Sequence, residues 1–477
     1  MSSCNASLRL MRNRILNNLN PLQIGIAAVS ILILGLFCYA VNFSLSIPIL
    51  LLLLGLYLKG YKAIDTKLFL HFGLLLALIV FVTYAFLTYT SISALYIPVA
   101  AVAMLVMLLY NDLQLAFVMS FASSVLVGLI AGNRLDLMII YFCGSLIGAF
   151  SVRDSRTRSE LINAGFFIGI VQVLCVVLLN PSAEFLFTKE FALNHLRALF
   201  FNGFISAFAV VATLKIFENI FGVMTNFSLL EMSDFNHPLL KRMILESPGT
   251  YHHSLFVSNL SETAADAIGA NSLLARVGGY YHDIGKLDKP QYFTENQIFE
   301  SNKHDKLEPS MSRLVILNHV KNGMELARKY KLNSIVSDFI VQHHGTSVMH
   351  YFYQRAVSEA QEGETVDEQT FRYPGPKPQT RETAIVLLAD SVEGACRALE
   401  EPTPTRIDET VRKIINNKFI DGQLDDCNLT LKDLDRISAT FSRVLSAMYH
   451  SRIKYPEKTN GYTANRKKST EENSNKS

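Results

Sequence analysis

The sequence contains no tryptophan, few cysteines and few charged residues, and each shortage narrows the class of protein. Without tryptophan, aromatic contacts at a membrane surface would have to come from tyrosine. The six cysteines are scattered and form no CxxC pair, and the two in the second half suit a reducing cytosol. Charged residues make up 18% of the chain, and a net charge of +3 is too small to indicate polymeric nucleic acid as a partner.

The charge deficit is confined to the first half of the chain, where long apolar runs follow one another up to about residue 222. Runs of about 15 to 24 apolar residues are long enough to span a bilayer as helices. We therefore predict an N-terminal segment at 1–21 and a bundle of about seven to eight spans at 22–222. The expected spans are Leu22–Val41, Ser44–Leu58, Leu68–Leu87, Ile92–Tyr110, Leu113–Gly132, Leu137–Val152, Leu161–Leu179 and Ala198–Phe221.

The distribution of lysine and arginine predicts the orientation of the bundle. Basic clusters precede span one and follow spans two and six, which places both termini in the cytosol if there are eight spans. We therefore expect a multi-pass protein of the cytoplasmic membrane, with the lipid bilayer as a partner. Ionisable residues do not recur within the spans, so a transporter is not favoured. The clusters are Arg9, Arg12 and Arg14; Lys59, Lys62 and Lys67; and Arg153, Arg156 and Arg158.

The second half of the chain reads as an all-helical soluble domain, because alternating strand patterns are nearly absent from it. We predict a connector at 223–248, the helical domain at 249–455 and a disordered tail at 456–477. The polar, proline-containing segment Glu362–Thr380 suits an exposed loop. The expected helices are Tyr251–Ile268, Ser272–His282, Met311–Tyr330, Ser334–His343, Glu382–Glu400, Arg406–Asn416 and Leu431–Tyr449.

Five histidines and two aspartates in this domain indicate a metal site. Imidazole and carboxylate groups bind borderline transition metals, and seven of them exceed what one ion can use. A two-metal hydrolytic site is therefore the natural interpretation. On the helix from Tyr251, His253 shares the apolar face, whereas His252 falls on a polar face and is not assigned as a ligand. The seven residues are His253, His282, Asp283, His319, His343, His344 and Asp390.

Four short motifs resemble the seven-transmembrane HD family, a branch of the HD-domain phosphohydrolases. They are Pro248–Ser254 (PGTYHHS), His282–Lys286 (HDIGK), His304–Lys306 (HDK) and Gln342–Thr346 (QHHGT). The characterised members of that family are cyclic-di-AMP phosphodiesterases. The related HD-GYP proteins, which cleave cyclic-di-GMP, usually carry a Gly-Tyr-Pro motif that this chain lacks. The resemblance therefore implies an HD phosphohydrolase domain placed in the cytosol after the membrane bundle.

The resemblance also implies roles for individual residues. His253, His282, Asp283 and Asp390 would hold one divalent ion, and His319, His343 and His344 the second, with Asp283 bridging. The two ions would be iron or manganese, since the histidine content disfavours magnesium and calcium. A hydroxide activated by both ions would open cyclic-di-AMP to a linear dinucleotide. We expect Asp283, Lys286 and His304 to be catalytic, and Lys286, His304, Lys306 and Tyr351 to contact the substrate.

One departure from the family and two alternatives stay open at this point. Only about Asn42 and Phe43 separate the first two spans, so the large extracellular domain typical of the family is missing. The first alternative is an HD-type hydrolase of another nucleotide, either cyclic-di-GMP or an alarmone. The second is a signal-binding membrane protein whose HD domain is structural. A homo-oligomer is also left open.

Overall fold

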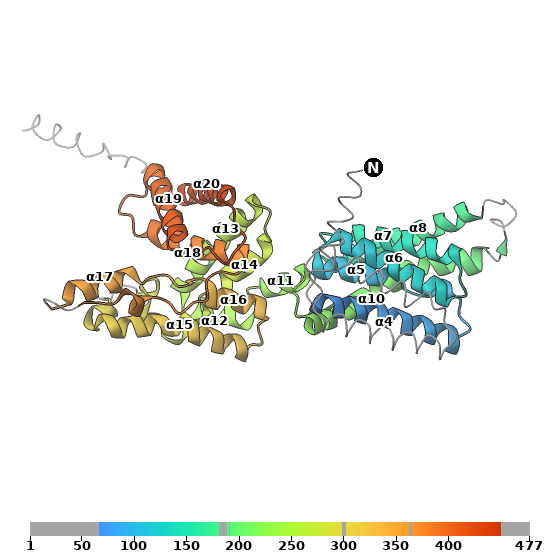
Figure 1. Ribbon diagram of the computed structural model, residues 1–477, viewed down its shortest axis with the longest axis horizontal. Coiled ribbons are helices and arrows are strands. Elements are labelled where there is room, and N and C mark those ends of the chain that lie inside the picture. The colour runs from blue at the N-terminus through green and yellow to red at the C-terminus, as the bar shows by residue number, and fades with distance from the viewer. Residues whose placement is uncertain (1–65, 181–187, 190, 298–301, 362–364, 450–477) are drawn as a thin grey trace, which may run out of the picture. The chain divides into compact units, whose positions relative to one another are not determined.

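The computed structural model describes residues 66–180, 188–189, 191–297, 302–361 and 365–449, and within these ranges it contains helices and no named strand (Figure 1). This confirms the all-α prediction. The chain divides into two compact units. The first comprises Met1–Glu246 with Met324–Asp338, and the second comprises Ser247–Gly323 with Phe339–Ser477. The predicted segment 1–21, the first two predicted spans and the tail at 456–477 lie outside the described residues.

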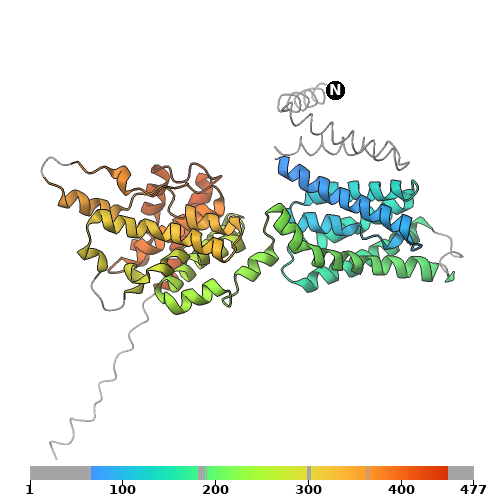
Figure 2. The same cartoon turned by 90° about the horizontal axis from the view of Figure 1, so that it is seen from below.

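The membrane unit contains a helical segment for each of the six remaining predicted spans (Figure 2). Four are long and apolar enough to cross a membrane, and two, Ala94–Tyr110 and Leu135–Ser151, are shorter. The helices are α4 (Thr66–Tyr89), η1 (Ala94–Tyr96), α5 (Ala100–Tyr110), α6 (Leu113–Ile130), α7 (Leu135–Ser151), α8 (Arg158–Leu179), the π-helical turn η2 (Phe191–Leu196) and α10 (Arg197–Phe221). Two short helices follow, α11 (Asn226–Met232) and α12 (Pro238–Glu246).

Local sequence signals explain where these helices begin and how closely they pack. The side chain of Asp112 accepts hydrogen bonds from two backbone amides at the start of α6, and Thr157 with Glu160 forms a capping box at the start of α8. Helices α8 and α10 approach through glycines. A Cβ on Gly203 would lie 1.9 Å from the carbonyl oxygen of Gly165, so no larger residue fits this crossing without a shift.

A buried carboxylate ties α10 to α11. Glu218 near the end of α10 is 4% exposed. It accepts a hydrogen bond of 2.9 Å from the backbone amide of Thr225 and one of 2.6 Å from the hydroxyl of Ser228. The Thr225 hydroxyl also donates to it. Gly222 provides the left-handed turn between the two helices, with φ +65°. The glutamate therefore anchors the start of α11.

The second unit is a helical domain, and its seven predicted helices are all present. It contains α13 (Pro248–Ala267), α14 (Ser272–Tyr281), α15 (Pro309–Lys329) as far as Gly323, α16 (Ser334–Gln342) from Phe339, α17 (His350–Glu359), α18 (Arg381–Arg397), α19 (Pro404–Ile420) and α20 (Leu431–Met448). Short 3₁₀ turns connect them: η3 (Ile284–Asp288), η4 (Pro290–Tyr292), η5 (Thr294–Asn296), η6 (Lys303–Lys306) and η7 (Glu368–Phe371). Helix α17 was not predicted, because its sequence is polar and aromatic and lacks a clear apolar stripe.

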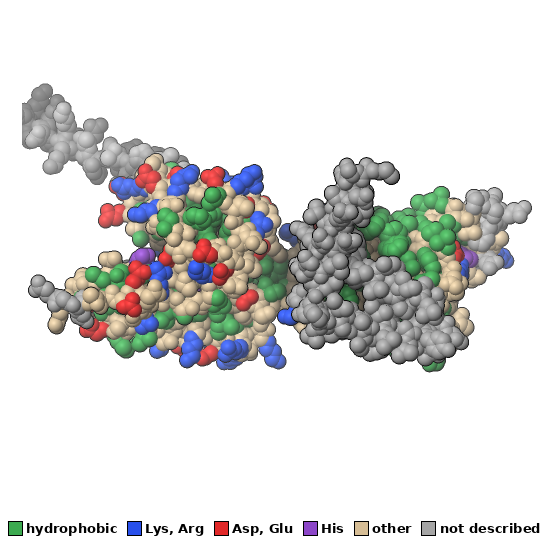
Figure 3. Space-filling model, viewed as in Figure 1, with side chains coloured by type: hydrophobic (Ala, Val, Ile, Leu, Met, Phe, Trp, Pro, Cys, Tyr) green, Lys and Arg blue, Asp and Glu red, His purple; other side chains and the backbone are tan. Residues whose placement is uncertain are grey.

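Helix α18 lies at the centre of this domain. The five side chains Ile385–Ala389 have no exposed surface, and α18 packs against α13, α14 and α19 (Figure 1). Val257 and Leu260 of α13 and Phe339 of α16 complete the core around it. Acidic and basic side chains are interspersed over the visible face of this domain, whereas apolar side chains gather on the visible surface of the membrane unit (Figure 3). The buried run of α18 leads directly into Asp390.

Candidate metal centre

The dipeptide His282-Asp283 lies at the junction between α14 and η3. Helix α14 ends at Tyr281, and the backbone of Asp283 leaves the helical conformation with φ −111° and ψ 14°. Adjacent residues on a regular helix point about 100° apart, so this break lets both side chains face the same space. Gly285 is required nearby for close packing, because a Cβ there would lie 1.8 Å from the carbonyl oxygen of His319 on α15.

The first donor set is made of His253 on α13, His282, Asp283 and Asp390 on α18. One donor atom from each lies within 4.8 Å of the others. The Nε2 atom of His253 is 3.0 Å from Oδ1 of Asp390 and 3.5 Å from Oδ2 of Asp283, and Nε2 of His282 is 3.3 Å from the same Oδ2. His253 is buried and His252 is exposed, which confirms the face predicted from the helical pattern.

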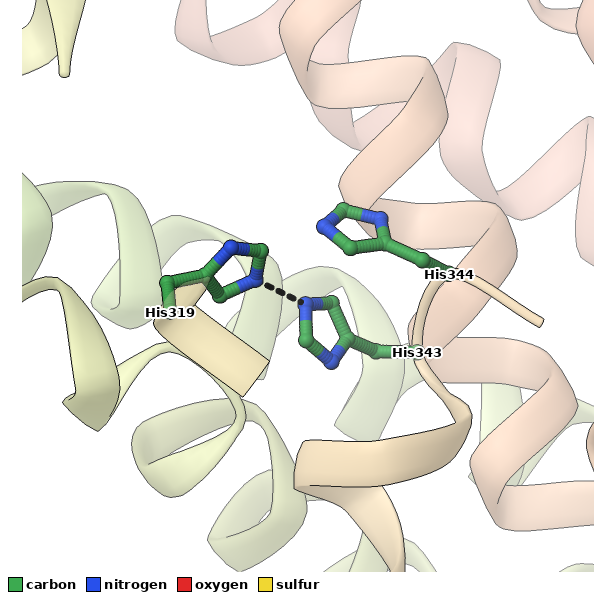
Figure 4. Close-up of side chains that lie close together, drawn as sticks. All are labelled: His319, His343 and His344. Atoms are coloured by element: carbon green, nitrogen blue, oxygen red, sulfur yellow. Dashed lines mark hydrogen bonds between the residues drawn. The ribbon is translucent and has the colours of Figure 1, made fainter. Parts of the chain in front are cut away.

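The second donor set is made of His319 on α15 and of His343 and His344, which follow α16. Donor atoms of the three residues also lie within 4.8 Å of one another. The three rings converge on one space, with Nε2 of His319 and Nε2 of His343 3.3 Å apart (Figure 4). His344 is the most exposed of the three, with 22% of its side chain accessible, and its Nδ1 lies 3.7 Å from Oδ2 of Asp390.

Asp283 lies between the two sets. Its Oδ2 faces His253 and His282, and its Oδ1 is 3.5 Å from Nε2 of His319 and 3.6 Å from Nε2 of His343. The residue is 1% exposed. A buried carboxylate with one oxygen toward each group of donors has the geometry that a bridging ligand requires.

Three of the imidazoles are oriented by backbone carbonyl groups. A carbonyl oxygen only accepts hydrogen bonds, so the Nδ1 atom facing it carries the proton and the Nε2 atom presents a lone pair. The contacts are His282 Nδ1 to Gly279 O at 2.8 Å, His319 Nδ1 to Ile316 O at 2.5 Å and His343 Nδ1 to Ile340 O at 2.9 Å.

These tautomers leave electron-rich atoms facing one another. The dashed line between His319 and His343 in Figure 4 then joins two Nε2 acceptors, which repel unless a cation is near. Within the described residues, Nε2 of His253, Nε2 of His282 and Oδ1 of Asp283 are buried without a hydrogen-bond partner. Such atoms are costly to bury unpaired. The donor sets therefore fit divalent metal ions.

The electrostatics of the metal-free site favour the ligand forms of most of these groups. Burial lowers the pKa of His343 to about 3 and also lowers the pKa of His319 and His344, so all three are neutral near pH 7. Burial opposes ionisation of Asp283, but the charge of Lys286 together with the contacts to His282 and His319 outweighs burial and holds the pKa of the carboxyl well below its ordinary value. Neutral imidazoles and an ionised carboxylate are the states that bind metals.

His253 differs from the other histidines. Burial acts to lower its pKa, but the carboxylates of Asp390 and Glu393 outweigh burial and raise the pKa of His253 to about 9. Oε2 of Glu393 lies 2.8 Å from Nδ1 of His253, and Arg397 forms an ion pair with Glu393. A carboxylate behind the non-coordinating nitrogen fixes the ring and raises its basicity. Glu393 therefore orients His253 toward the first donor set.

A cavity of about 410 Å³ opens beside the donors, and its lining includes Lys286, Glu295, His304, His319, His344 and Tyr373. Lys286 is largely enclosed, with 13% of its side chain exposed. Its Nζ lies 2.7 Å from Oδ2 of Asp283 and 2.8 Å from Oε1 of Glu295. Gly249 permits the approach of the Glu295 segment, because a Cβ there would lie 1.9 Å from the carbonyl oxygen of Glu295.

The remaining predicted substrate residues lie in different surroundings. His304 is buried and lines the cavity, but its Nε2 donates to the carbonyl oxygen of Tyr292 at 2.9 Å, so that proton is already used. Tyr351 lines the cavity edge and is 62% exposed. Lys306 is exposed and is not part of the lining. The structure thus brings His304 and Tyr351 to the cavity and leaves Lys306 outside it.

The expectation that Glu362–Thr380 is an exposed loop is wrong for part of this segment. Phe371 is 4% exposed, and Tyr373 stacks on His344 with ring centroids 4.1 Å apart and an angle of 27° between the planes. The backbone amide of Tyr373 donates to the carbonyl oxygen of Ser347 at 3.0 Å. The prolines indicated an irregular backbone but did not indicate that it returns to the metal centre.

Sequence reasoning missed three residues at this centre: Glu295, Glu393 and Tyr373. A signal existed for Glu393, which lies three residues after Asp390 and so shares its face of a buried helix. Glu295 and Tyr373 come from irregular segments, where side-chain periodicity gives no information.

Comparison with protein families assigns both halves of the chain. Residues 33–225 match the family described as "7TM receptor with intracellular HD hydrolase", and residues 250–395 match the HD domain. Together with the four long apolar helices, the first match identifies a membrane protein. The second match spans all seven donors, from His253 to Asp390, which agrees with divalent metal binding by these donor sets.

Two curated relatives and one solved structure are similar to this chain. The cyclic-di-AMP phosphodiesterase PgpH of Bacillus subtilis is 40% identical over 76% of this chain and 51% of its own length. PgpH of Listeria monocytogenes is 42% identical over 65% of this chain and 44% of its own length. The chain therefore spans about half of each relative. A crystal structure of the Listeria PgpH HD domain with cyclic-di-AMP is 47% identical, with a TM-score of 0.43, over 46% of this chain and 100% of that one.

Proposed function

Because this chain belongs to the family that joins a seven-transmembrane unit to an HD hydrolase domain, we propose that it is a membrane-bound, metal-dependent phosphodiesterase acting on cyclic-di-AMP. The product would be a linear dinucleotide. The position of Asp283, with one carboxylate oxygen toward each donor set, is the observation that carries the reaction type. The substrate follows from the relatives, which are named as cyclic-di-AMP phosphodiesterases at 40% and 42% identity.

We assign the donors to two divalent ions. His253, His282, Asp283 and Asp390 would hold one ion, and His319, His343 and His344 would hold the other, with Asp283 shared. Five imidazoles favour a borderline transition metal, so iron or manganese is the proposed occupant. When bound, the two ions would supply Lewis-acid stabilisation of the phosphate and acidify a water molecule.

The chain's own residues would bind and orient the substrate. Lys286 is held between Asp283 and Glu295, so it presents a fixed positive charge at the cavity wall for the phosphate. We assign His304 a positioning role, because its Nε2 proton is committed to the carbonyl oxygen of Tyr292. Tyr351 at the cavity edge would stack on a base. The predicted substrate contact of Lys306 gains no support from the cavity lining.

Two alternatives predict different measurements. A hydrolase of cyclic-di-GMP would share the metal centre and differ only in base preference. An alarmone hydrolase with one ion would not need the second donor set, which is buried and convergent here. A protein with a merely structural HD domain would be free to lose ligands, whereas every donor expected from the motifs lies in one of the two sets.

We further propose that the HD domain lies in the cytosol and that the chain is a multi-pass protein of the cytoplasmic membrane. The basic clusters at 153–158 and at 59–67 support this orientation. Single cysteines placed in the tail at 456–477 should react with a membrane-impermeant reagent only after cell lysis. Labelling of this tail in intact cells would contradict the topology.

The proposed activity can be tested on the full chain in detergent under anaerobic conditions. Manganese or ferrous iron should bind at two equivalents per chain, chelation should abolish hydrolysis, and readdition of manganese should restore it. Cyclic-di-AMP should be cleaved about ten- to a hundredfold faster than cyclic-di-GMP, since a pocket that accepts a hydrogen bond from the adenine amino group leaves its acceptor unpaired against guanine. Equal rates would remove the base preference.

Neighbouring histidines on α13 give a matched pair of variants. His253→Ala should lose most activity and one metal equivalent, whereas His252→Ala alters an exposed side chain one residue away and should change neither. Asp283→Ala should lose both ions, because it serves both sets, and His319→Ala should mainly weaken one. A wild-type protein that holds a single equivalent under metal-replete conditions would overturn the two-ion assignment.

A further inference from the structure

We propose that Tyr373 is a further catalytic residue, whose hydroxyl donates a hydrogen bond to an oxygen of the scissile phosphodiester while its ring fixes His344. The inference rests on the proposed phosphodiesterase function. It adds to the metal centre a donor from a segment outside the recognised motifs.

The ring of Tyr373 supplies a restraint that His344 otherwise lacks. His282, His319 and His343 each have an Nδ1 fixed by a backbone carbonyl, and Glu393 fixes His253. His344 has no hydrogen bond of this kind, because its Nδ1 lies 3.7 Å from Oδ2 of Asp390, and it is the most exposed of the five, with 22% of its side chain accessible. Tyr373 stacks on it at 4.1 Å and 27°. The stacked ring therefore limits the orientations available to this imidazole.

The hydroxyl of Tyr373 is available to a ligand. Tyr373 lines the cavity beside His319 and His344. Across the described ranges its hydroxyl makes no hydrogen bond, and the residue is partly exposed. A neutral phenol is a hydrogen-bond donor. An unpaired donor at the cavity wall next to the second donor set is positioned to meet the phosphate.

The backbone holds Tyr373 at this place firmly. Its amide donates to Ser347 at 3.0 Å, and the guanidinium of the preceding Arg372 donates to the carbonyl oxygen of Thr346 at 2.9 Å. Arg372 is itself paired with Asp421 at 2.9 Å. Both carbonyl acceptors belong to the turn that directly follows His343 and His344. Tyr373 is therefore fixed to the same short segment that carries two of the metal donors.

Hydrolysis of a phosphodiester forms a bond from the oxygen of water to phosphorus and breaks the bond to the 3′ oxygen, which takes up a proton. Negative charge develops on the phosphoryl oxygens and on the departing oxygen. A preorganised donor at either place stabilises the transition state, and loss of one such donor typically lowers kcat about 10²–10³-fold.

The test compares three variants of the full chain in detergent, with metal equivalents measured for each. Tyr373→Phe keeps the stacked ring and removes only the hydroxyl, so kcat for cyclic-di-AMP should fall about 10²-fold with two metal equivalents retained. Tyr373→Leu also removes the stacking and should weaken one metal as well. Tyr353→Phe is the matched control. Tyr353 packs on Phe371 and does not line the cavity, so its kcat should be unchanged.

A second substrate separates this inference from the proposed function. Bis(p-nitrophenyl) phosphate contains a phosphodiester but no base, and its leaving group needs no proton. A loss in Tyr373→Phe on both substrates, or on cyclic-di-AMP alone, supports the donor role. If the wild type cleaves only the synthetic diester, the dinucleotide assignment fails and Tyr373 is judged on that substrate. The inference is overturned if Tyr373→Phe has the same kcat as the wild type on every substrate that the wild type cleaves. It is also overturned if the wild type cleaves neither diester.

Discussion

Replacement of Gly285 by alanine tests whether close packing of η3 on α15 is what brings the two donor sets together. The added Cβ would lie 1.8 Å from the carbonyl oxygen of His319 and 2.5 Å from the amide nitrogen of Gly323. Both neighbours are backbone atoms, so neither can rotate away. A heavy-atom separation near 3 Å requires the two segments to move apart by more than about 1 Å.

Such a shift is large relative to what a metal centre tolerates. Ligand distances in metal sites hold to about 0.2 Å, and Asp283 on this segment lies only 3.5 Å from His319. We expect the affinity of the second ion to fall at least about 10–100-fold and phosphodiesterase activity to fall with it. Overpacking should also destabilise the domain by about 1–3 kcal/mol.

Gly394 provides the control for this substitution. It lies within α18, four residues after Asp390, and a Cβ there would meet no atom within 4 Å. Gly394→Ala should therefore leave the metals bound and stabilise the helix by about 0.5–1 kcal/mol. Metal equivalents, competition with a chelator and the apparent melting temperature should be measured for both variants. Two tightly bound ions and an unchanged melting temperature in Gly285→Ala would refute the reasoning.

Three further predictions follow from named contacts. Glu393→Gln should weaken metal binding about 10–100-fold by removing the charge behind His253, and an unchanged affinity in chelator competition would contradict that role. In the metal-free protein, neighbouring carboxylates overcome burial and raise the pKa of His253 to about 9, so the ion must displace a proton. Metal affinity should therefore weaken up to about tenfold per pH unit below pH 9. Calorimetric titrations that give the same affinity from pH 6 to 9 would disprove this. Glu218→Ala should lower the stability of the chain by about 1–3 kcal/mol, because it leaves Thr225 and Ser228 without their acceptor. The apparent melting temperature of the solubilised chain should therefore fall. An unchanged melting temperature would show that the contact is dispensable.

The sequence was sufficient to predict the helices and to select the side chains that the structure brings together as candidate metal donors, for a definite physical reason. Apolar periodicity marks the buried face of a helix, and a histidine or carboxylate on that face is costly unless it is paired or bound to a metal. His253 was separated from His252 by this criterion, and Asp390 was found at the end of a wholly apolar run. Both are placed by the structure within the same donor set.

The same criterion fails where a residue reaches the centre from irregular backbone. Tyr373 lies 29 residues after His344 in a proline-containing segment, so no helical or strand pattern relates the two. Their contact depends on the hydrogen bond from Tyr373 to Ser347 and on the ion pair of Arg372 with Asp421. These interactions join segments that are far apart along the chain, and the local sequence of each segment does not indicate which other segment it contacts.

The glycines beside the metal donors mark places where a distant segment packs closely, but the sequence does not show which segment it is. Gly285 follows the break at His282-Asp283, and its role in the structure is to admit the carbonyl oxygen of His319. Gly345 combines both roles, with φ +54° and with Oε1 of Gln423 at 2.3 Å from where its Cβ would be. That glutamine oxygen accepts the amide of Thr346 at 2.8 Å and so secures the turn after the paired histidines. A glycine beside a metal donor therefore indicates that another segment packs there, and only the folded chain identifies that segment as α15 in one case and Gln423 in the other.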